Sequence, residues 1–260
     1  MEHKTCRTLR VVAVRLLNGG EQFLLTLENP GFSAWKPGQF VMIRPVSWGF
    51  EMVWARPVSI AWCDEHGLTL VVRRAGRGTA RMAGLAPGDE VTLWGPLGTS
   101  FVTDPAAPTL LLAGGIGLAP FWGYAARHPA PENLHLLFGH TLPLDAFPME
   151  PFASLGKVET FYQQTAEQLG EFVALLEARV ADFAAREKGL VLACGPGPFL
   201  RTVHRLALAH GVRCQLSLEN RMACGIGACL GCVATDASGH RVQSCTRGPV
   251  FWATDLSPEF

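Results

Sequence analysis

The sequence predicts an antiparallel β-barrel followed by a doubly wound α/β sheet, with a cysteine-rich segment at the end. Three observations lead to this fold class. Short apolar runs separated by turn residues fill the first hundred residues, strand-like and helix-like runs alternate over the next hundred, and four of the eight cysteines lie beyond residue 223. A chain of 260 residues is long enough to bury a core in each of two such parts.

The N-terminal runs have the spacing of strands in a small barrel or sandwich. Asn18-Gly19-Gly20 is a hairpin signal, and Lys36-Pro37-Gly38 and Pro87-Gly88-Asp89 mark further turns. Between the last two strands, Thr79–Leu85 is expected to form one short helix. The six expected strands are Leu9–Leu16, Gln22–Leu27, Phe40–Ile43, Val58–Trp62, Leu68–Arg73 and Glu90–Trp94.

A stretch with two prolines, 103–108, is the expected linker to the second part. Thr109–Ala113 is a buried-strand run, and a glycine-rich turn and a helix ending at Ala126 follow it. This alternation continues and predicts a parallel sheet with helices on both faces. The further strands expected are Leu134–Phe138, Val158–Phe161 and Leu190–Ala193, and the further helices are Glu171–Arg186 and Pro198–His210.

Composition excludes several classes of protein. Hydrophobic residues make up 48% of the chain and charged residues 17%, which argues against a disordered chain. Lys plus Arg and Asp plus Glu both number 22, so no basic surplus favours nucleic acid or a polybasic membrane anchor. The most apolar stretch, Leu110–Trp122, is too short for a membrane span, and Met1–Arg10 lacks the apolar region of a signal peptide. We therefore expect a cytoplasmic protein.

The clustered cysteines carry the most specific signal. Cys224, Cys229, Cys232 and Cys245 have the spacing C-x4-C-x2-C-x12-C, which is typical of a plant-type 2Fe–2S site with its fourth ligand on a later segment. Glycines between them let the backbone wrap closely around a cluster. Structural zinc is the alternative, but zinc sites favour C-x2-C pairs and only one such pair is present.

Two glycine-rich turns end strands and open helices in the second part. Gly114, Gly115 and Gly117 belong to one, and Gly195 and Pro196 to the other. Such turns let a pyrophosphate approach the backbone at a helix N-terminus, and both would lie at the carboxyl edge of one sheet. A tight strand-to-helix turn without a ligand is the alternative for the first.

In the barrel part, Arg56 precedes Pro57, Val58 and Ser59, and Gly78-Thr79 opens the expected short helix. The Arg56 guanidinium could pair with a phosphate, and the helix start could donate amides to an anion. A surface ion pair is the alternative for Arg56.

Taken in order, these motifs resemble the ferredoxin–NADP reductase superfamily. The residues that carry the resemblance are Arg56–Ser59, Gly78-Thr79, Gly95–Gly98, Gly114–Pro120 and Cys194–Pro196. The ending, Ser217–Cys232 with Cys245 and Gly248–Phe251, is similar to the electron-transfer subunits of two-component, NAD-dependent dihydroorotate dehydrogenases. The resemblance covers nearly the whole chain.

This resemblance implies a Greek-key FAD-binding barrel over residues 1–102, an NAD-binding α/β domain over 103–213 and a 2Fe–2S segment over 214–260. In that reading Arg56, Pro57, Val58 and Ser59 hold the flavin and its phosphates. Val71, Val72 and Arg73 line the flavin by backbone, and Gly78 and Thr79 bind pyrophosphate. Trp48 and Trp54 precede the flavin motif, and either could stack on the flavin or fill the barrel.

Reductases of this superfamily place a cysteine near the hydride path, which implies such a position for Cys194. The alternative for Cys194 is a small buried apolar residue. The chain shows no constellation that would activate a second substrate, as expected for an electron-transfer subunit.

The resemblance also implies a partner. A separate FMN-containing catalytic subunit would oxidise dihydroorotate in pyrimidine biosynthesis, and its electrons would cross the cluster to FAD and leave on NAD, in a heterotetramer with two copies of each chain. Ile226, Leu230 and residues 249–252 are apolar and would form the interface unless they pack on the chain itself. Two alternatives remain: a flavin and iron–sulfur NAD(P)H reductase subunit with another redox partner, and a zinc-stabilised binding module with an inactive nucleotide fold.

Overall fold

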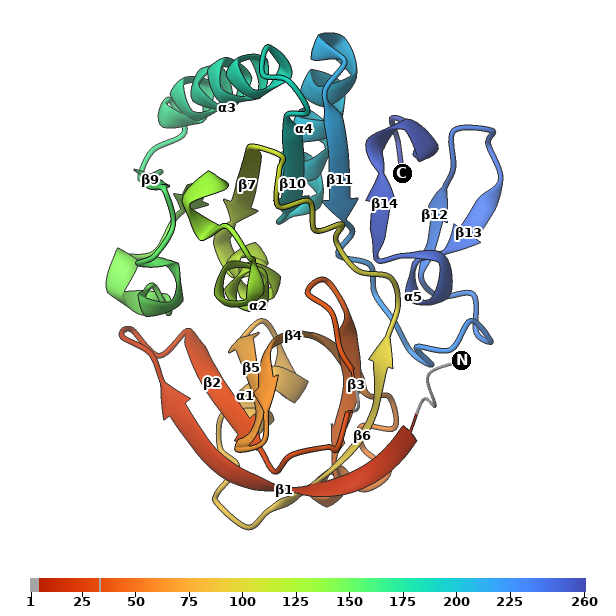
Figure 1. Cartoon of the computed structure of the whole chain (residues 1–260). Coiled ribbons are helices and arrows are strands. Elements are labelled where there is room, and N and C mark those ends of the chain that lie inside the picture. Colours follow the sequence, from red (N-terminus) through yellow and green to blue (C-terminus); the bar gives the residue numbers. More distant parts are fainter. Residues whose placement is uncertain (1–4, 33) are drawn as a thin grey trace.

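A computed structural model describes residues 5–32 and 34–260 of the chain (Figure 1). Residues 1–4, where the stretch examined above for a signal peptide begins, lie outside the described residues, as does residue 33. Within the described residues, no helix combines the length and the apolar character needed to cross a membrane.

Six antiparallel strands close into a barrel in the order β1-β2-β5-β4-β3-β6, which confirms the predicted Greek-key barrel. Alternate residues point inward, so that Phe23, Leu25, Ile43 and Ile60 are fully buried in its core. The short helix α1 (Arg77–Met82) starts two residues earlier than expected. The strands are β1 (Thr5–Leu16), β2 (Gln22–Leu27), β3 (Phe40–Pro45), β4 (Arg56–Asp64), β5 (Gly67–Arg73) and β6 (Glu90–Leu97).

The second part is a six-stranded sheet in the order β14-β11-β10-β7-β8-β9, in which the five strands from β11 to β9 are parallel. Their carboxyl ends point toward the barrel (Figure 1). Helix α2 (Ala119–Arg127) covers one face, and α3 (Gln168–Ala184) and α4 (Gly197–His210) cover the other, as predicted. The parallel strands are β7 (Thr109–Gly114), β8 (Leu134–His140), β9 (Lys157–Tyr162), β10 (Leu190–Cys194) and β11 (Arg213–Ser217).

The C-terminal segment is more ordered than its irregular sequence suggests. It forms a hairpin of β12 (Val233–Thr235) and β13 (Arg241–Gln243), the helical turn α5 (Ser244–Arg247) and strand β14 (Val250–Trp252). Strand β14 lies antiparallel beside β11 at the edge of the main sheet, with Leu216 opposite Phe251. The sequence allows two arrangements for these apolar residues, an interface with a partner or packing on the chain itself. In the structure, residues 250–252 pack on the chain itself.

Helix α2 joins the sheet to the barrel by close packing. A Cβ atom on Gly123 would lie 2.4 Å from the Trp35 ring and 3.0 Å from the Ala61 carbonyl oxygen, so only glycine lets the helix approach the barrel this closely. Arg127, at the end of α2, lies over the Trp35 ring and donates to the Trp35 carbonyl at 2.9 Å. This contact holds the carboxyl edge of the sheet against the open end of the barrel.

Candidate functional site: a cavity between barrel and sheet beside a cysteine cluster

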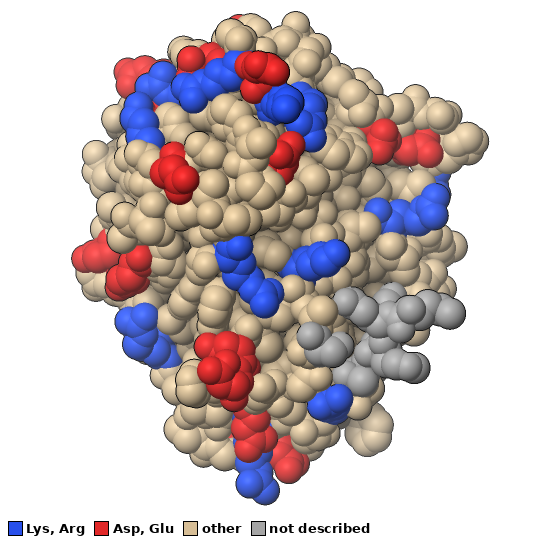
Figure 2. Space-filling view, in the orientation of Figure 1, with Lys and Arg blue, Asp and Glu red and all other residues tan. Residues whose placement is uncertain are grey.

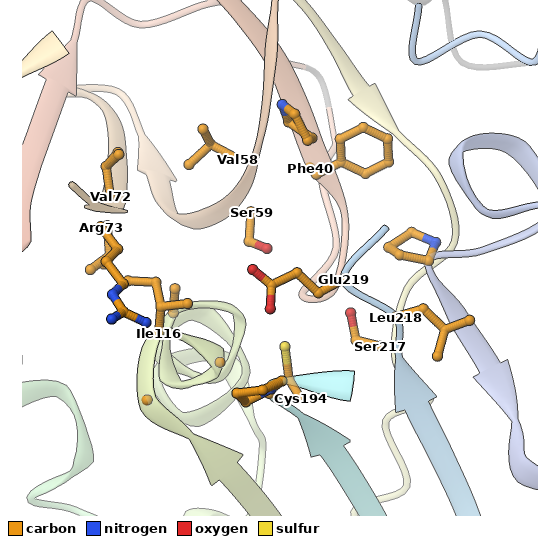
Figure 3. Close-up of a pocket in the computed structure, with 18 of the residues that line it drawn as sticks. Phe40, Val58, Ser59, Val72, Arg73, Ile116, Cys194, Ser217, Leu218 and Glu219 are labelled. Atoms are coloured by element: carbon orange, nitrogen blue, oxygen red, sulfur yellow. The ribbon is translucent and has the colours of Figure 1, made fainter. Parts of the chain in front are cut away.

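A cavity of about 290 Å³ lies where the barrel meets the carboxyl edge of the sheet (Figure 3). Strands β3, β4 and β5 supply its barrel wall, and the turns after β7, β10 and β11 supply the opposite wall. Residues from both parts of the chain therefore meet around one space, as expected for a site in which two nucleotide groups face each other.

Most residues predicted to hold the flavin line this cavity. They are Pro57, Val58 and Ser59 from β4, Val71, Val72 and Arg73 from β5, and Thr79 from α1. Thr79 also organises the loop before its helix, because its hydroxyl accepts from the amides of Ala75 and Gly76 at 2.9 and 3.2 Å.

Arg56 and Gly78 lie directly behind the lining. A Cβ on Gly78 would come within 2.9 Å of the Arg56 guanidinium, so the missing side chain makes room for the arginine. The guanidinium donates to the Trp54 carbonyl at 2.5 Å and lies 5.1 Å from the centre of the Trp48 ring. These contacts hold Arg56 at the start of α1, beside the cavity.

The two tryptophans take different places. Trp48 is 2% exposed and belongs to the barrel core, whereas Trp54 is 59% exposed on the surface. Neither is among the residues that line the cavity: Trp48 fills the barrel and Trp54 faces outward.

Replacing Arg56 with alanine is expected to weaken FAD binding by about one to two decades, because one charge-assisted pair with a phosphate contributes ~1.5–3 kcal/mol. The measurement is the dissociation constant of FAD, obtained by titrating flavin-free protein. Arg81→Ala is the matched control, since Arg81 on α1 pairs with Glu51 at the surface. Unchanged FAD affinity in Arg56→Ala would show that Arg56 only stabilises the loop of Trp54, whose carbonyl accepts its hydrogen bond.

The two glycine-rich turns meet at the other wall. Gly115, Gly117, Gly195 and Pro196 line the cavity, and Gly114 packs behind them, 3.1 Å from the position of a Cβ on Gly195. A Cβ on Gly117 would lie 2.1 Å from the carbonyl oxygen of Cys194, which no backbone could accommodate. Glycine at this position is what lets the two turns come into contact at the cavity wall.

Cys194 ends β10 at the floor of the cavity. Burial, reinforced by the nearby carboxyl of Glu219, raises the pKa of its thiol to about 12. The side chain is therefore a neutral thiol at physiological pH and is no nucleophile there. Its position agrees with either sequence reading, a residue beside the hydride path or a small buried group.

Sequence reasoning missed Glu219, the one acidic side chain that lines the cavity. Figure 3 shows its carboxyl between Ser59 on the barrel side and Cys194 and Ser217 on the sheet side. Burial raises the pKa of Glu219 above its ordinary value, against an opposing effect of Arg73. Glu219 belongs to the stretch Ser217–Cys232 that carries the family resemblance, but only the fold places its carboxyl in the cavity.

The four clustered cysteines form two pairs. The Cys229 amide donates to the Cys224 sulfur at 3.4 Å, and Cys232 and Cys245 pack together in one small core. The first pair reaches the surface, since Cys229 is exposed, whereas Cys232 and Cys245 are 2% and 0% exposed. One pair thus faces outward and the other faces the interior.

Backbone amides surround these sulfurs. The amides of Ile226 and Cys229 donate to the Cys224 sulfur at 3.5 and 3.4 Å, and that of Gly227 donates to the Cys245 sulfur at 3.2 Å. Burial raises the pKa of Cys224, but these amide hydrogen bonds outweigh it and lower the value to about 6. Amides directed at sulfur stabilise thiolates, the form in which cysteine binds iron.

The paired arrangement fits a cluster with two irons better than one zinc ion. A 2Fe–2S cluster takes two cysteines on each iron, whereas structural zinc takes four ligands around a single ion. The four thiols therefore match the ligand set of a 2Fe–2S cluster.

The cavity and the inner cysteine pair share a wall. Phe40 and Met222 both line the cavity, and both pack in the small core that contains Cys232 and Cys245. On the other side of this core, the Trp94 indole donates to the Cys224 carbonyl at 3.1 Å. One layer of side chains thus separates the nucleotide cavity from the cysteines.

Barrel, sheet and cavity together have the architecture of ferredoxin reductases, extended by a cysteine-rich segment. Residues 219–257 match the family model of the iron–sulfur cluster binding domain of dihydroorotate dehydrogenase B. The chain is 33% identical to the dihydroorotate dehydrogenase B (NAD(+)) electron transfer subunit of Caldanaerobacter subterraneus subsp. tengcongensis, over 95% of this chain and 96% of that protein. It belongs to the family of dihydroorotate dehydrogenase B electron transfer subunits.

Other relatives agree. The electron transfer subunit of Shouchella clausii is 34% identical over 83% of this chain and 84% of its own length. Among solved structures, an NADH-dependent reduced ferredoxin-NADP oxidoreductase superposes with a TM-score of 0.80 at 24% identity, over 96% of this chain and 89% of that chain. A ferredoxin reductase of carbazole 1,9a-dioxygenase superposes with a TM-score of 0.63 over 80% of this chain. The predicted family, fold and cofactor classes (FAD, an iron–sulfur cluster and NAD) are confirmed.

Proposed function

We propose that this chain conveys electrons between an FMN-containing, dihydroorotate-oxidising partner subunit and NAD, by way of a 2Fe–2S cluster and FAD. When bound, FAD supplies the exchange between hydride chemistry at a nicotinamide and one-electron chemistry at an iron–sulfur cluster. The observation that carries this proposal is the shared wall of Phe40 and Met222, which adjoins both the cavity and the inner cysteine pair.

Three sets of residues would bind FAD, the nicotinamide nucleotide and the irons. Pro57, Val58, Ser59, Val71, Val72 and Arg73 would hold the flavin ring and ribityl chain, and Arg56, Gly78 and Thr79 would hold its phosphates. Gly114, Gly115, Gly117, Gly195 and Pro196 would receive the nicotinamide nucleotide, with Cys194 beside the hydride path. Cys224, Cys229, Cys232 and Cys245 would ligate the irons. The lining of one cavity supports these roles for most of the residues, and Arg56, Gly78 and Gly114 lie directly behind that lining.

We also propose the division into residues 1–102, 103–213 and 214–260, an assembly with two copies of each subunit, and a cytoplasmic location. Both signs of charge occur across the face in Figure 2, as expected for a chain whose partner is a protein and not a nucleic acid.

The proposed docking face surrounds the outer cysteine pair. Ile226 and Leu230 are 57% and 58% exposed on the cysteine loop. Trp54 and Val53 are similarly exposed, and their neighbour Ala55 packs against the core of Cys232 and Cys245. Apolar side chains gathered around a redox centre favour a protein interface.

Replacing Leu230 with glutamate is expected to weaken the complex with the dihydroorotate-oxidising subunit and to lower coupled reduction of NAD by dihydroorotate at limiting subunit concentration. A buried unpaired charge at an interface costs about 2–5 kcal/mol. NADH oxidation by artificial flavin acceptors should be preserved. Leu208→Glu, on the exposed face of α4, is the matched control. Full coupled turnover by Leu230→Glu at low concentration would show that the docking face lies elsewhere.

A reductase subunit with a different redox partner is the second candidate. The TM-score of 0.80 to an NADH-dependent reduced ferredoxin-NADP oxidoreductase favours this alternative, because that structure shares nearly the whole fold. The two functions differ in one measurement. If adding the FMN-containing subunit produces no dihydroorotate-dependent NAD reduction, while NADH still reduces the bound flavin, the partner is another protein.

A further inference from the structure

Ser244, the first residue of α5, carries a buried hydroxyl that has no partner. The residue is fully buried, and its Oγ has no hydrogen-bond partner among the residues that the structure describes. Both backbone groups of the same residue are paired, since its amide donates to the Cys232 carbonyl at 2.9 Å and its carbonyl accepts from the Gly248 amide at 3.2 Å. Buried hydroxyls in folded proteins are nearly always paired, so this one indicates an acceptor that a bound group supplies.

The position of Ser244 is between the two cysteines of the inner pair. It directly precedes Cys245 in the chain, and it continues the register of the β12–β13 hairpin, in which Val233 lies opposite Gln243. Its neighbour across the hairpin is therefore Cys232. Residues directly opposite each other in an antiparallel pair share a face and have Cβ atoms ~4.5–5.5 Å apart. This spacing brings the Ser244 hydroxyl within reach of the Cys232 sulfur.

The Cys232 sulfur is also the one of the four that lacks a donor from the backbone. The other three cysteine sulfurs each accept a hydrogen bond from an amide of the loop 226–231. At Cys229, for example, the donor is the Gly231 amide at 3.4 Å. Within residues 5–32 and 34–260, no backbone amide donates to Cys232. A thiolate that binds iron is charged, and charged acceptors make the stronger hydrogen bonds.

We propose that the Ser244 hydroxyl donates a hydrogen bond to the Cys232 sulfur when the cluster is bound, and that this bond raises the reduction potential of the cluster. The inference rests on the proposed function only in taking the four cysteines as ligands of a 2Fe–2S cluster.

The physical reason is the charge that reduction adds. One electron, exchanged with the flavin or with the partner subunit, adds one negative charge, while no bond at sulfur forms or breaks and no proton moves. A donor directed at sulfur stabilises the more negative reduced form more than the oxidised form. Hydrogen bonds to the sulfurs are among the factors that set the potentials of iron–sulfur clusters.

Ser244→Ala tests the donor in the full chain loaded with the cluster and FAD. Potentiometric titration with redox mediators, followed by electron paramagnetic resonance of the reduced cluster, gives the reduction potential. The equilibrium constant for one-electron reduction should fall about tenfold, which corresponds to a potential lower by about 59 mV. Iron and acid-labile sulfide should stay at about two of each per chain, because all four ligands are kept.

Thr246→Val is the matched control. Thr246 is the neighbour of Cys245 on the other side, and its hydroxyl already donates to the Gln243 carbonyl at 3.5 Å. Valine removes this hydroxyl at nearly constant volume and should leave the same equilibrium constant within about twofold. An unchanged potential in Ser244→Ala, or an equal shift in Thr246→Val, would overturn the proposal.

Resonance Raman spectra of the oxidised cluster identify the accepting sulfur. Loss of the Ser244 hydroxyl should shift the stretching bands between iron and cysteine sulfur. A shift confined to the bands of the bridging sulfides would overturn the assignment to Cys232. Loss of the cluster from Ser244→Ala would show that the hydroxyl serves assembly of the site, and would overturn the tuning role. A wild type that holds no iron would instead contradict the proposed function itself.

Discussion

Cys229→Ser should lose its iron while keeping its flavin. Cys229 belongs to the outer cysteine pair and is exposed, so serine at this position removes one iron ligand without opening a cavity in the core. Iron and acid-labile sulfide are expected to fall from about two of each per chain toward zero. No residue that lines the nucleotide cavity is changed, so FAD content and NADH reduction of the flavin should persist.

Cys6→Ser is the control for this experiment, because Cys6 is also exposed but lies on β1, outside the cysteine segment. It should keep the full complement of iron and sulfide. Retention of iron in Cys229→Ser would remove this cysteine from the ligand set. Zinc in place of iron in anaerobically prepared wild-type protein would contradict the cluster altogether.

Gly117→Ala should abolish efficient reduction of the flavin by NADH. The added Cβ would lie 2.1 Å from the Cys194 carbonyl oxygen and 2.7 Å from the Gly195 amide nitrogen, so the two nucleotide turns must separate. Both contacts are backbone atoms, and no side-chain rotation can relieve them. A displacement of about 1 Å at a hydride site costs on the order of a hundredfold in rate. Anaerobic stopped-flow measurement of flavin reduction gives this rate directly.

Gly170→Ala is the matched control in the same sheet region. Gly170 lies near the start of α3, and a Cβ there meets no atom within 4 Å, so alanine should be tolerated or should stabilise the helix by about 0.5–1 kcal/mol. A normal reduction rate in Gly117→Ala would mean that the close approach of the two turns does not position the nicotinamide.

The sequence predicts the fold well because most of its elements have strong local signals. The barrel strands are short apolar-rich runs between turn residues, and β7, β8 and β10 are mostly apolar, with every residue buried. The cysteine spacing by itself indicates a cluster, since few other sites use it. Helix α1 begins at Arg77, two residues before the expected Thr79. Thr79 lies in the first turn, where its hydroxyl accepts a hydrogen bond from the amide of Gly76, the residue before the helix.

Other features depend on tertiary contacts that no local pattern encodes. Strand β14 has three residues, too few for a periodic signal, and forms because β11 offers an open edge. Glu219 joins the site because β11 directs the chain past the cavity. Arg56 carries a recognisable motif, but its place behind Gly78 depends on the packing of β4 against α1.

The neighbouring positions of β11 and β14 make the cysteine segment an excursion that leaves and rejoins the sheet at the same edge. Antiparallel neighbours can be joined by a turn of a few residues. Residues 218–249 thus occupy the place of a hairpin loop, and a reductase scaffold could acquire or lose its metal centre by exchanging that loop. The pairing of β11 with β14 thus fixes both ends of the segment at the same edge of the sheet.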